Sequence, residues 1–128
     1  EWVDGDSGNT FPILNPATGI EICKMASGTK NDARFSITCA QNALQNWRQT
    51  TAKYRSEILK GWYRLIVENI DDLAFILNSE QGKPLAEAKS EILYGASYIE
   101  WFAEEAKRIY GDIIPTNNTT QRLLTIKQ

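Results

Sequence analysis

The chain has 128 residues, of which 42% are apolar and 23% charged, an ordinary composition for a globular domain. Its 14 basic and 16 acidic residues give a formal charge of -2, so no basic patch is available to neutralise nucleic-acid phosphates. Apolar runs such as Leu73 to Leu77 are far shorter than the roughly 20 residues that span a membrane. These features argue against nucleic-acid and membrane partners, and without a visible secretion signal we expect a cytoplasmic protein.

The sequence has few residues of the kinds that act as nucleophiles or bind metal ions. The chain has no histidine, and Cys23 and Cys39 lack CxxC spacing, so the sequence predicts neither a zinc site nor a Ser-His or Cys-His nucleophile. Cys39 lies among helical residues and is expected to be a buried or half-buried structural thiol. A cation beside Cys23, Lys24, favours thiolate, but a structural role is favoured for this cysteine too. Without a GxGxxG or GxxxxGK[ST] loop, we assign no catalytic, cofactor-binding or metal residue.

The first quarter of the chain is expected to form short strands, within residues of about 2–25. Alternation from Phe11 predicts one strand, and Asn15 to Gly19 predicts a tight reversal, because Asn-Pro keeps Asn15 extended and Gly19 can adopt a left-handed conformation. Residues 20–25 then return as the second strand of a hairpin. Trp2-Val3 is expected to add a short third strand.

Helices are predicted from capping residues and apolar spacing. Thr29 and Asp32 resemble a capping box, Thr51 offers a second N-cap, and Asn69 can cap a third helix. Gly82 suits the left-handed position after a helix, and Pro84 suits the first turn of the next. The predicted helices cover residues of about 30–47, 52–68, 70–81 and 84–110.

The last of these helices is expected to be the longest. Its apolar stripe runs through Leu85, Ala88, Ile92, Gly95, Ile99, Phe102, Ala106 and Ile109. Gly95 is unfavourable inside a helix, so we expect another backbone to approach it closely. Pro115 ends the element, and a polar loop precedes a strand from Arg122. Because that strand would present an unpaired edge, we expect it to be part of a larger domain.

Charged side chains on these helices are expected to have structural roles. Glu104 and Arg108 have the spacing of a surface helix pair. Arg55 and Arg64 could grip a substrate carboxylate, but helix-surface or ion-pair roles are favoured.

Three aromatic residues, Tyr94, Tyr98 and Trp101, are spaced by four and three and share one helix face. Packing is the default interpretation of such a row. The alternative is that the row lines a substrate tunnel, since ligand pockets are largely apolar and aromatic with a few polar groups. The two hydroxyls would be those polar groups.

Several segments, in order along the chain, carry a family resemblance: Glu1 to Gly5, Asn15-Pro16-Ala17-Thr18-Gly19, Trp47-Arg48, Glu80-Gln81-Gly82-Lys83-Pro84-Leu85-Ala86-Glu87-Ala88, Tyr94 to Glu105, Tyr110-Gly111-Asp112-Ile113-Ile114-Pro115, and Arg122-Leu123-Leu124. Together they resemble the aldehyde dehydrogenase superfamily. Their sequences are most similar to its NAD(P)-dependent succinate-semialdehyde dehydrogenase branch. The resemblance implies the N-terminal portion of an α/β fold. In it, short strands and four helices flank a Rossmann-like cofactor domain, and a strand of the oligomerisation arm follows.

By the same resemblance, residues 1–120 are the N-terminal part of the cofactor-binding domain, and residues 121–128 begin the oligomerisation strand of a homodimer or homotetramer. The implied reaction oxidises succinic semialdehyde to succinate with NAD or NADP, through attack of a cysteine thiolate on the aldehyde. The implied cysteine, base and cofactor residues lie beyond Gln128, so the 128 residues alone are expected to be inactive and to need the rest of their own chain. Tyr94, Tyr98 and Trp101 correspond to one side of the family's substrate tunnel.

Two alternatives stay open. Glutaric semialdehyde differs from succinic semialdehyde by one methylene, which discriminates only weakly. The lack of nucleophile, base and phosphate loop would also suit a non-catalytic helical interaction module.

Overall fold

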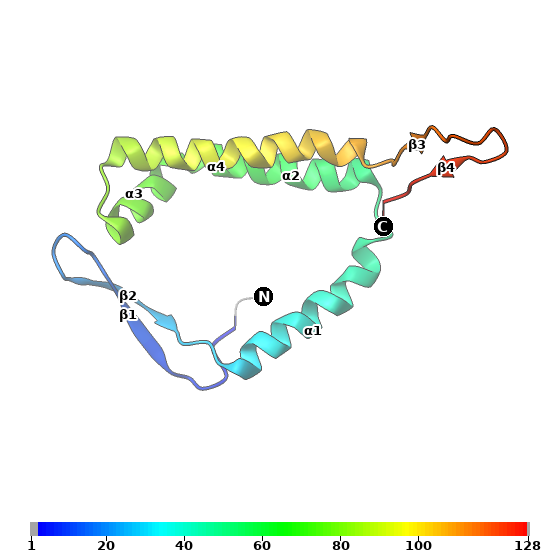
Figure 1. The fold of residues 1–128 in the computed structure, drawn as a ribbon. Helices are drawn as coiled ribbons and strands as arrows, with labels where there is room; N and C mark the ends of the chain where they lie inside the picture. Colours follow the sequence, from blue (N-terminus) through cyan, green and yellow to red (C-terminus); the bar gives the residue numbers. More distant parts are fainter. Residues whose placement is uncertain (1–2, 128) are drawn as a thin grey trace.

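The computed structural model describes residues 3–127, and four helices dominate it, as the sequence predicted (Figure 1). Three of them form a layer in which α4 lies along α2 and also packs against α3. A short 3-10 turn continues α4. The bounds are α1 Lys30–Trp47, α2 Ala52–Glu68, α3 Ile70–Gln81, α4 Leu85–Glu105 and η1 Ala106–Arg108.

Small side chains form the seam of this layer. Ala88, Ala96 and Ala103 of α4 are buried and lie about two helical turns apart, on one face. Ala74 of α3 and Ser56 of α2 are buried as well. Side chains of this size let helix backbones approach closely, so the helices meet along their smallest residues.

This seam corrects part of the expected apolar stripe of the long helix. Ala88 and Ala106 are buried as expected, whereas Gly95, Phe102 and Ile109 are exposed, because the other buried positions fall on the neighbouring Ala96 and Ala103. The expected close approach of a backbone to Gly95 is not found in the described part of the chain, since a Cβ built there has no atom of another element within 4 Å. The helix is shorter than expected too, since it ends at Glu105 before the 3-10 turn.

The predicted N-caps of α1 and α2 are confirmed. Thr29 Oγ1 accepts hydrogen bonds from the backbone N–H groups of Asn31 and Asp32 at 3.2 and 3.3 Å. Asp32 Oδ2 in turn accepts from the Thr29 N–H at 2.6 Å, which completes the capping box. Thr51 Oγ1 accepts from the Tyr54 N–H at 3.2 Å at the start of α2.

Asn69 is the N-cap residue of α3, as predicted, but its side chain does not cap this helix. Asn69 Nδ2 donates to the Leu65 carbonyl at 2.8 Å, and its side chain makes no capping bond to α3. Asn69 is the single residue between α2 and α3, and its side chain satisfies the last turn of α2 instead.

The N-terminal strands form the expected hairpin. Strands β1 (Thr10–Leu14) and β2 (Glu21–Ala26) pair antiparallel. In the turn, Asn15 Oδ1 accepts from the Ala17 N–H at 2.9 Å, and Gly19 has the left-handed φ of 71°. Of the expected third strand, Trp2 lies outside the described residues and Val3 is not in a strand.

A second, shorter ribbon follows the helical layer and projects beyond the ends of α2 and α4 (Figure 1). Strands β3 (Ile113–Ile114) and β4 (Leu123–Leu124) pair antiparallel. The last strand therefore has a partner on one edge, and its other edge has none among residues 3–127. At the base of the ribbon, the Thr125 N–H donates to the Asp112 carbonyl at 2.9 Å. Gly111, with a φ of 78°, lies directly against Thr125.

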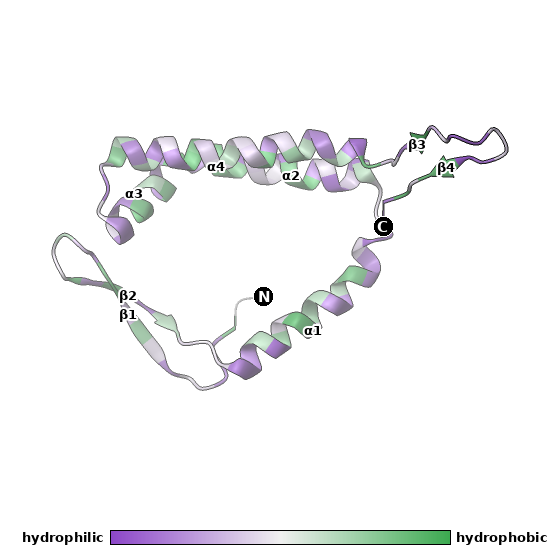
Figure 2. Ribbon diagram, viewed as in Figure 1, coloured by the Kyte–Doolittle hydropathy of each residue, from purple (hydrophilic) through white to green (hydrophobic). Residues whose placement is uncertain are grey.

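Much apolar surface stays exposed. Helix α1 contains no buried residue, so Cys39, which was expected to be at least half-buried, is exposed. Figure 2 shows hydrophobic residues along α1 and both ribbons. The chain exposes 10670 Å², whereas a compact monomer of its mass would expose about 6,900 Å². The described elements therefore form an open arrangement and leave apolar faces uncovered.

Candidate functional site

The three aromatic residues selected from the sequence lie together on α4. Tyr94, Tyr98 and Trp101 line a groove of about 840 Å³ along one face of this helix, together with Ser97 and Phe102. The helical spacing of four and three places the three rings in one row. Their exposed fractions of 64%, 48% and 66% show that the groove is open on this chain.

The two tyrosines interact directly. Their hydroxyl oxygens are 2.5 Å apart, and their rings meet edge to face, with centroids separated by 5.0 Å and an interplanar angle of 89°. The hydrogen bond to Tyr94 raises the pKa of Tyr98, and desolvation adds to this effect. Tyr98 therefore stays a neutral phenol at neutral pH. The sequence placed both rings on one face but did not reveal this bond, because it depends on side-chain conformation.

Most carboxylates along the groove are engaged in ion pairs. Glu104 lies 3.0 Å from Lys60 Nζ and 2.8 Å from Lys107 Nζ. These lysines, with the hydrogen bond from Lys107 as the largest cause, lower the pKa of Glu104 to about 2. The predicted pair of Glu104 with Arg108 is wrong, since Arg108 Nη1 instead lies 2.6 Å from Glu105. The cross-helix partner Lys60 could not be found from spacing within one helix.

The two arginines that could have gripped a substrate have structural partners. Arg55 Nη1 donates to the Thr50 carbonyl at 2.5 Å and so fixes the corner between α1 and α2. Arg64 Nε lies 3.7 Å from Glu68 on the surface of α2. The structural interpretation of both residues agrees with these contacts.

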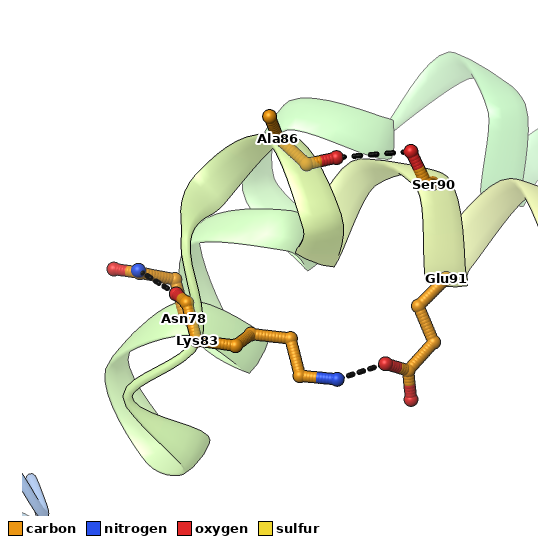
Figure 3. A network of polar contacts seen from close by, with 5 residues as sticks. All are labelled: Asn78, Lys83, Ala86, Ser90 and Glu91. Atoms are coloured by element: carbon orange, nitrogen blue, oxygen red, sulfur yellow. Dashed lines mark hydrogen bonds and ion pairs between the residues drawn. The ribbon is translucent and has the colours of Figure 1, made fainter.

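The segment Glu80 to Ala88, which carries much of the family resemblance, forms the corner between α3 and α4 (Figure 3). Asn78 Nδ2 donates to the Lys83 carbonyl at 2.5 Å, and Lys83 Nζ pairs with Glu91 of α4. Pro84 was predicted to lie in the first turn of α4. It is instead the N-cap residue that precedes this turn. The corner is held by its own polar contacts, which indicates a structural role.

Gly82 ends α3 in the predicted left-handed conformation, with a φ of 73°. It also faces the N-terminal hairpin, because a Cβ built on Gly82 would lie 3.0 Å from Pro16 Cγ. Two segments that carry the resemblance are thus in contact in the folded chain.

The starts of α1 and α4 do not suit the phosphate groups of a nicotinamide dinucleotide. The Thr29 hydroxyl and the Asp32 carboxylate occupy the N-terminus of α1, and hydrogen bonds from the backbone, first that of Thr29, lower the pKa of Asp32. A fixed carboxylate at this position repels phosphate. Near the start of α4, the cation of Lys83 is paired with Glu91. Neither of these two helix starts therefore offers a free phosphate-binding site.

The described residues hold neither a metal-binding cluster nor a membrane-spanning helix. Residues 3–127 contain no group of three or more acidic, cysteine or histidine side chains arranged to hold a metal ion. Within these residues, no helix combines the length and apolar character that crossing a membrane requires.

The sequence and the fold of this chain match a known enzyme family. The chain belongs to the aldehyde dehydrogenase family, whose sequence model matches residues 2–128. It is 54% identical to glutarate-semialdehyde dehydrogenase of Pseudomonas putida and 49% identical to the NADP(+) succinate-semialdehyde dehydrogenase GabD of Escherichia coli, over 128 residues in each case. Both alignments cover 100% of this chain but only 27% of the relative, so the chain spans about a quarter of their length.

Solved structures agree with this assignment. An Escherichia coli NADP dependent enzyme superposes with a TM-score of 0.95 at 49% identity, and the match covers 100% of this chain and 27% of that one. Succinate-semialdehyde dehydrogenase from Burkholderia pseudomallei gives a TM-score of 0.92 at 48% identity, and covers 97% of this chain and 26% of that one. The expected fold class, a portion of the aldehyde dehydrogenase fold with four helices and short antiparallel strands, is confirmed.

Proposed function

We propose that the chain is part of an enzyme that oxidises succinic semialdehyde to succinate with NAD or NADP. The observation that carries the proposal is the identity of about one half, over the whole chain, to the succinate- and glutarate-semialdehyde dehydrogenases. A relative from Pseudomonas putida that is 47% identical is a 3-sulfolactaldehyde dehydrogenase. The names of all three substrates describe a short aldehyde that also bears an acid group.

Glutaric semialdehyde is the second candidate substrate. It is favoured by the 54% identity to the Pseudomonas putida glutarate-semialdehyde dehydrogenase. One methylene changes binding by only about 1–3 kcal/mol in an apolar pocket, so neither substrate is expected to be strongly excluded.

In this proposal the aromatic groove is one wall of the route by which substrate enters. Tyr94, Tyr98 and Trp101 form an apolar surface with polar hydroxyls, which suits a short carbon chain with a polar end. No residue of 3–127 is given a catalytic or cofactor-binding role. Residues 1–120 are assigned to the cofactor-binding domain as its N-terminal part.

We further propose that residues 121–128 begin an oligomerisation strand of a homodimer or homotetramer. The ribbon of β3 and β4 supports this proposal because it projects from the helical layer and exposes Ile113 and Leu124.

The test is to purify the intact gene product and follow NAD(P)H absorbance with succinic semialdehyde, glutaric semialdehyde and uncharged butanal, each with NAD and with NADP. Turnover of succinic semialdehyde with clear preference over butanal supports the proposal. A protein that binds the cofactor but oxidises no acid-bearing aldehyde overturns it. An intact gene product of 14.5 kDa that is monomeric and unfolds cooperatively would favour the helical interaction module instead.

A further inference from the structure

The hydrogen bond between the two groove tyrosines leaves one hydroxyl proton available. When two phenols bond, one donates and the other keeps its own O–H for another acceptor. The edge-to-face contact, with centroids 5.0 Å apart, holds both rings in place. Either hydroxyl oxygen can be the donor in this pair. When Tyr98 donates, Tyr94 is the acceptor and keeps its own O–H free. Tyr94 is also the more exposed of the two, at 64% against 48%.

The free O–H of Tyr94 is a stronger donor than that of an isolated tyrosine, because accepting one hydrogen bond polarises the O–H toward a second acceptor. Tyr94 is 64% exposed and lines the groove, so its hydroxyl can reach a bound molecule there. A charged oxygen acceptor gives the strongest bond of this kind.

The charges around Tyr94 permit such an acceptor. Glu91, one helical turn before it, is paired with Lys83, and Glu104 is paired with two lysines. Glu100 makes no ion pair within the described residues, but it lies about 9 Å further along the helix axis, close to one Debye length at physiological salt. The Tyr94 end of the groove therefore offers a polarised neutral donor, and Glu100, which lines the same groove, lies further along the helix.

We propose that the Tyr94 hydroxyl, supported by Tyr98, donates a hydrogen bond to the acid group of the aldehyde substrate and thereby favours acid-bearing over uncharged aldehydes. This inference rests on the proposed function, because the groove is a substrate route only in that enzyme. Tyr94 touches the substrate, whereas Tyr98 is a positioning residue that acts through Tyr94.

The experiment compares Tyr94→Phe, Tyr98→Phe and the control Tyr54→Phe in the intact gene product. Tyr54 lies on α2 and does not line the groove. The readout is kcat/KM for succinic semialdehyde relative to butanal, together with the Kd of the product succinate by calorimetry. Tyr94→Phe should lower the preference and weaken succinate binding by about tenfold, through KM and not kcat. Tyr98→Phe should lower both by about twofold to threefold, and the control should change neither.

Two results would overturn this inference and leave the proposed function standing. If wild type prefers succinic semialdehyde and Tyr94→Phe retains that preference and its succinate affinity, the hydroxyl does not bind the acid group. If Tyr94→Phe affects both aldehydes equally, the ring acts only as a packing surface. A wild type that oxidises butanal but no acid-bearing aldehyde overturns the proposed function, and this inference with it.

Discussion

Replacing Gly111 by alanine should open the base of the β3–β4 ribbon. Gly111 has a φ of 78°, which costs a residue with a Cβ about 1–2 kcal/mol. The added Cβ would also overlap the Thr125 carbonyl oxygen and lie 2.9 Å from its carbonyl carbon, both of them backbone atoms that cannot rotate away. The two chain segments must therefore separate.

Separation would weaken two hydrogen bonds between Asp112 and Thr125, each 2.9 Å long. At about 1 kcal/mol per bond, the total loss is about 3–4 kcal/mol. Gly8→Ala is a matched control, because Gly8 also has a positive φ, of 65°, but its Cβ would meet no atom of residues 3–127 within 4 Å. The control should lose only the conformational part, about 1–2 kcal/mol.

The assay is urea unfolding of the intact gene product and both variants, with stability taken from the midpoint at constant slope. Hydrogen exchange of the Thr125 amide reports on the ribbon itself. If Gly111→Ala is no less stable than Gly8→Ala and Thr125 stays protected, the close approach at Gly111 is refuted.

Three other changes are open to the same unfolding measurements. Ser56→Ala should raise stability by about 1–2 kcal/mol, because Ser56 is 0% exposed and its hydroxyl has no hydrogen-bond partner within residues 3–127. The control Ser90→Ala, which removes an exposed hydroxyl bonded to the Ala86 carbonyl, should gain less, and equal gains would contradict the reasoning. Gly82→Ala should lose about 1–3 kcal/mol from its φ of 73° and its contact with Pro16, and adding Pro16→Ala should restore only the contact part. No rescue at all would show that the contact is unimportant. Glu104→Gln should destabilise the protein at neutral pH. Because the pKa of Glu104 is lowered to about 2 from 4.5, the ion pairs contribute fully above about pH 4.5 and are lost as the pH falls toward 2. The difference from wild type should shrink across that window, whereas Glu100→Gln should behave like wild type, and a pH-independent difference would rule out the ion pairs as its cause.

Local chemistry made part of this fold predictable. The capping box of Thr29 and Asp32 and the left-handed Gly82 depend on residues within one turn, so they could be read from sequence. Asn69 has two helix ends within reach, and propensity alone could not decide which one its side chain would satisfy. The burial of Ala96 instead of Gly95 depends on how α4 packs against its neighbours, which no single-helix pattern encodes.

In the candidate site, too, some features follow from local sequence and others depend on packing. Helical spacing placed Tyr94, Tyr98 and Trp101 in one row, and the structure has them along one groove. The hydroxyl pair and the bridge from Lys60 to Glu104 depend on side-chain conformation and on the meeting of α2 with α4. Neither could be derived from the order of residues.

The alanine seam also bears on how the chain reaches its native state. Helices α2, α3 and α4 are consecutive in the chain and are joined by short connections. Their contacts with one another all lie within residues 52–108. Contacts between near neighbours in sequence form quickly, so this layer can assemble while a ribosome is still synthesising the protein. During that interval the exposed faces of α1 and the two ribbons are targets for aggregation and for chaperones. Folding yield in the cell should therefore depend on how soon those faces are covered.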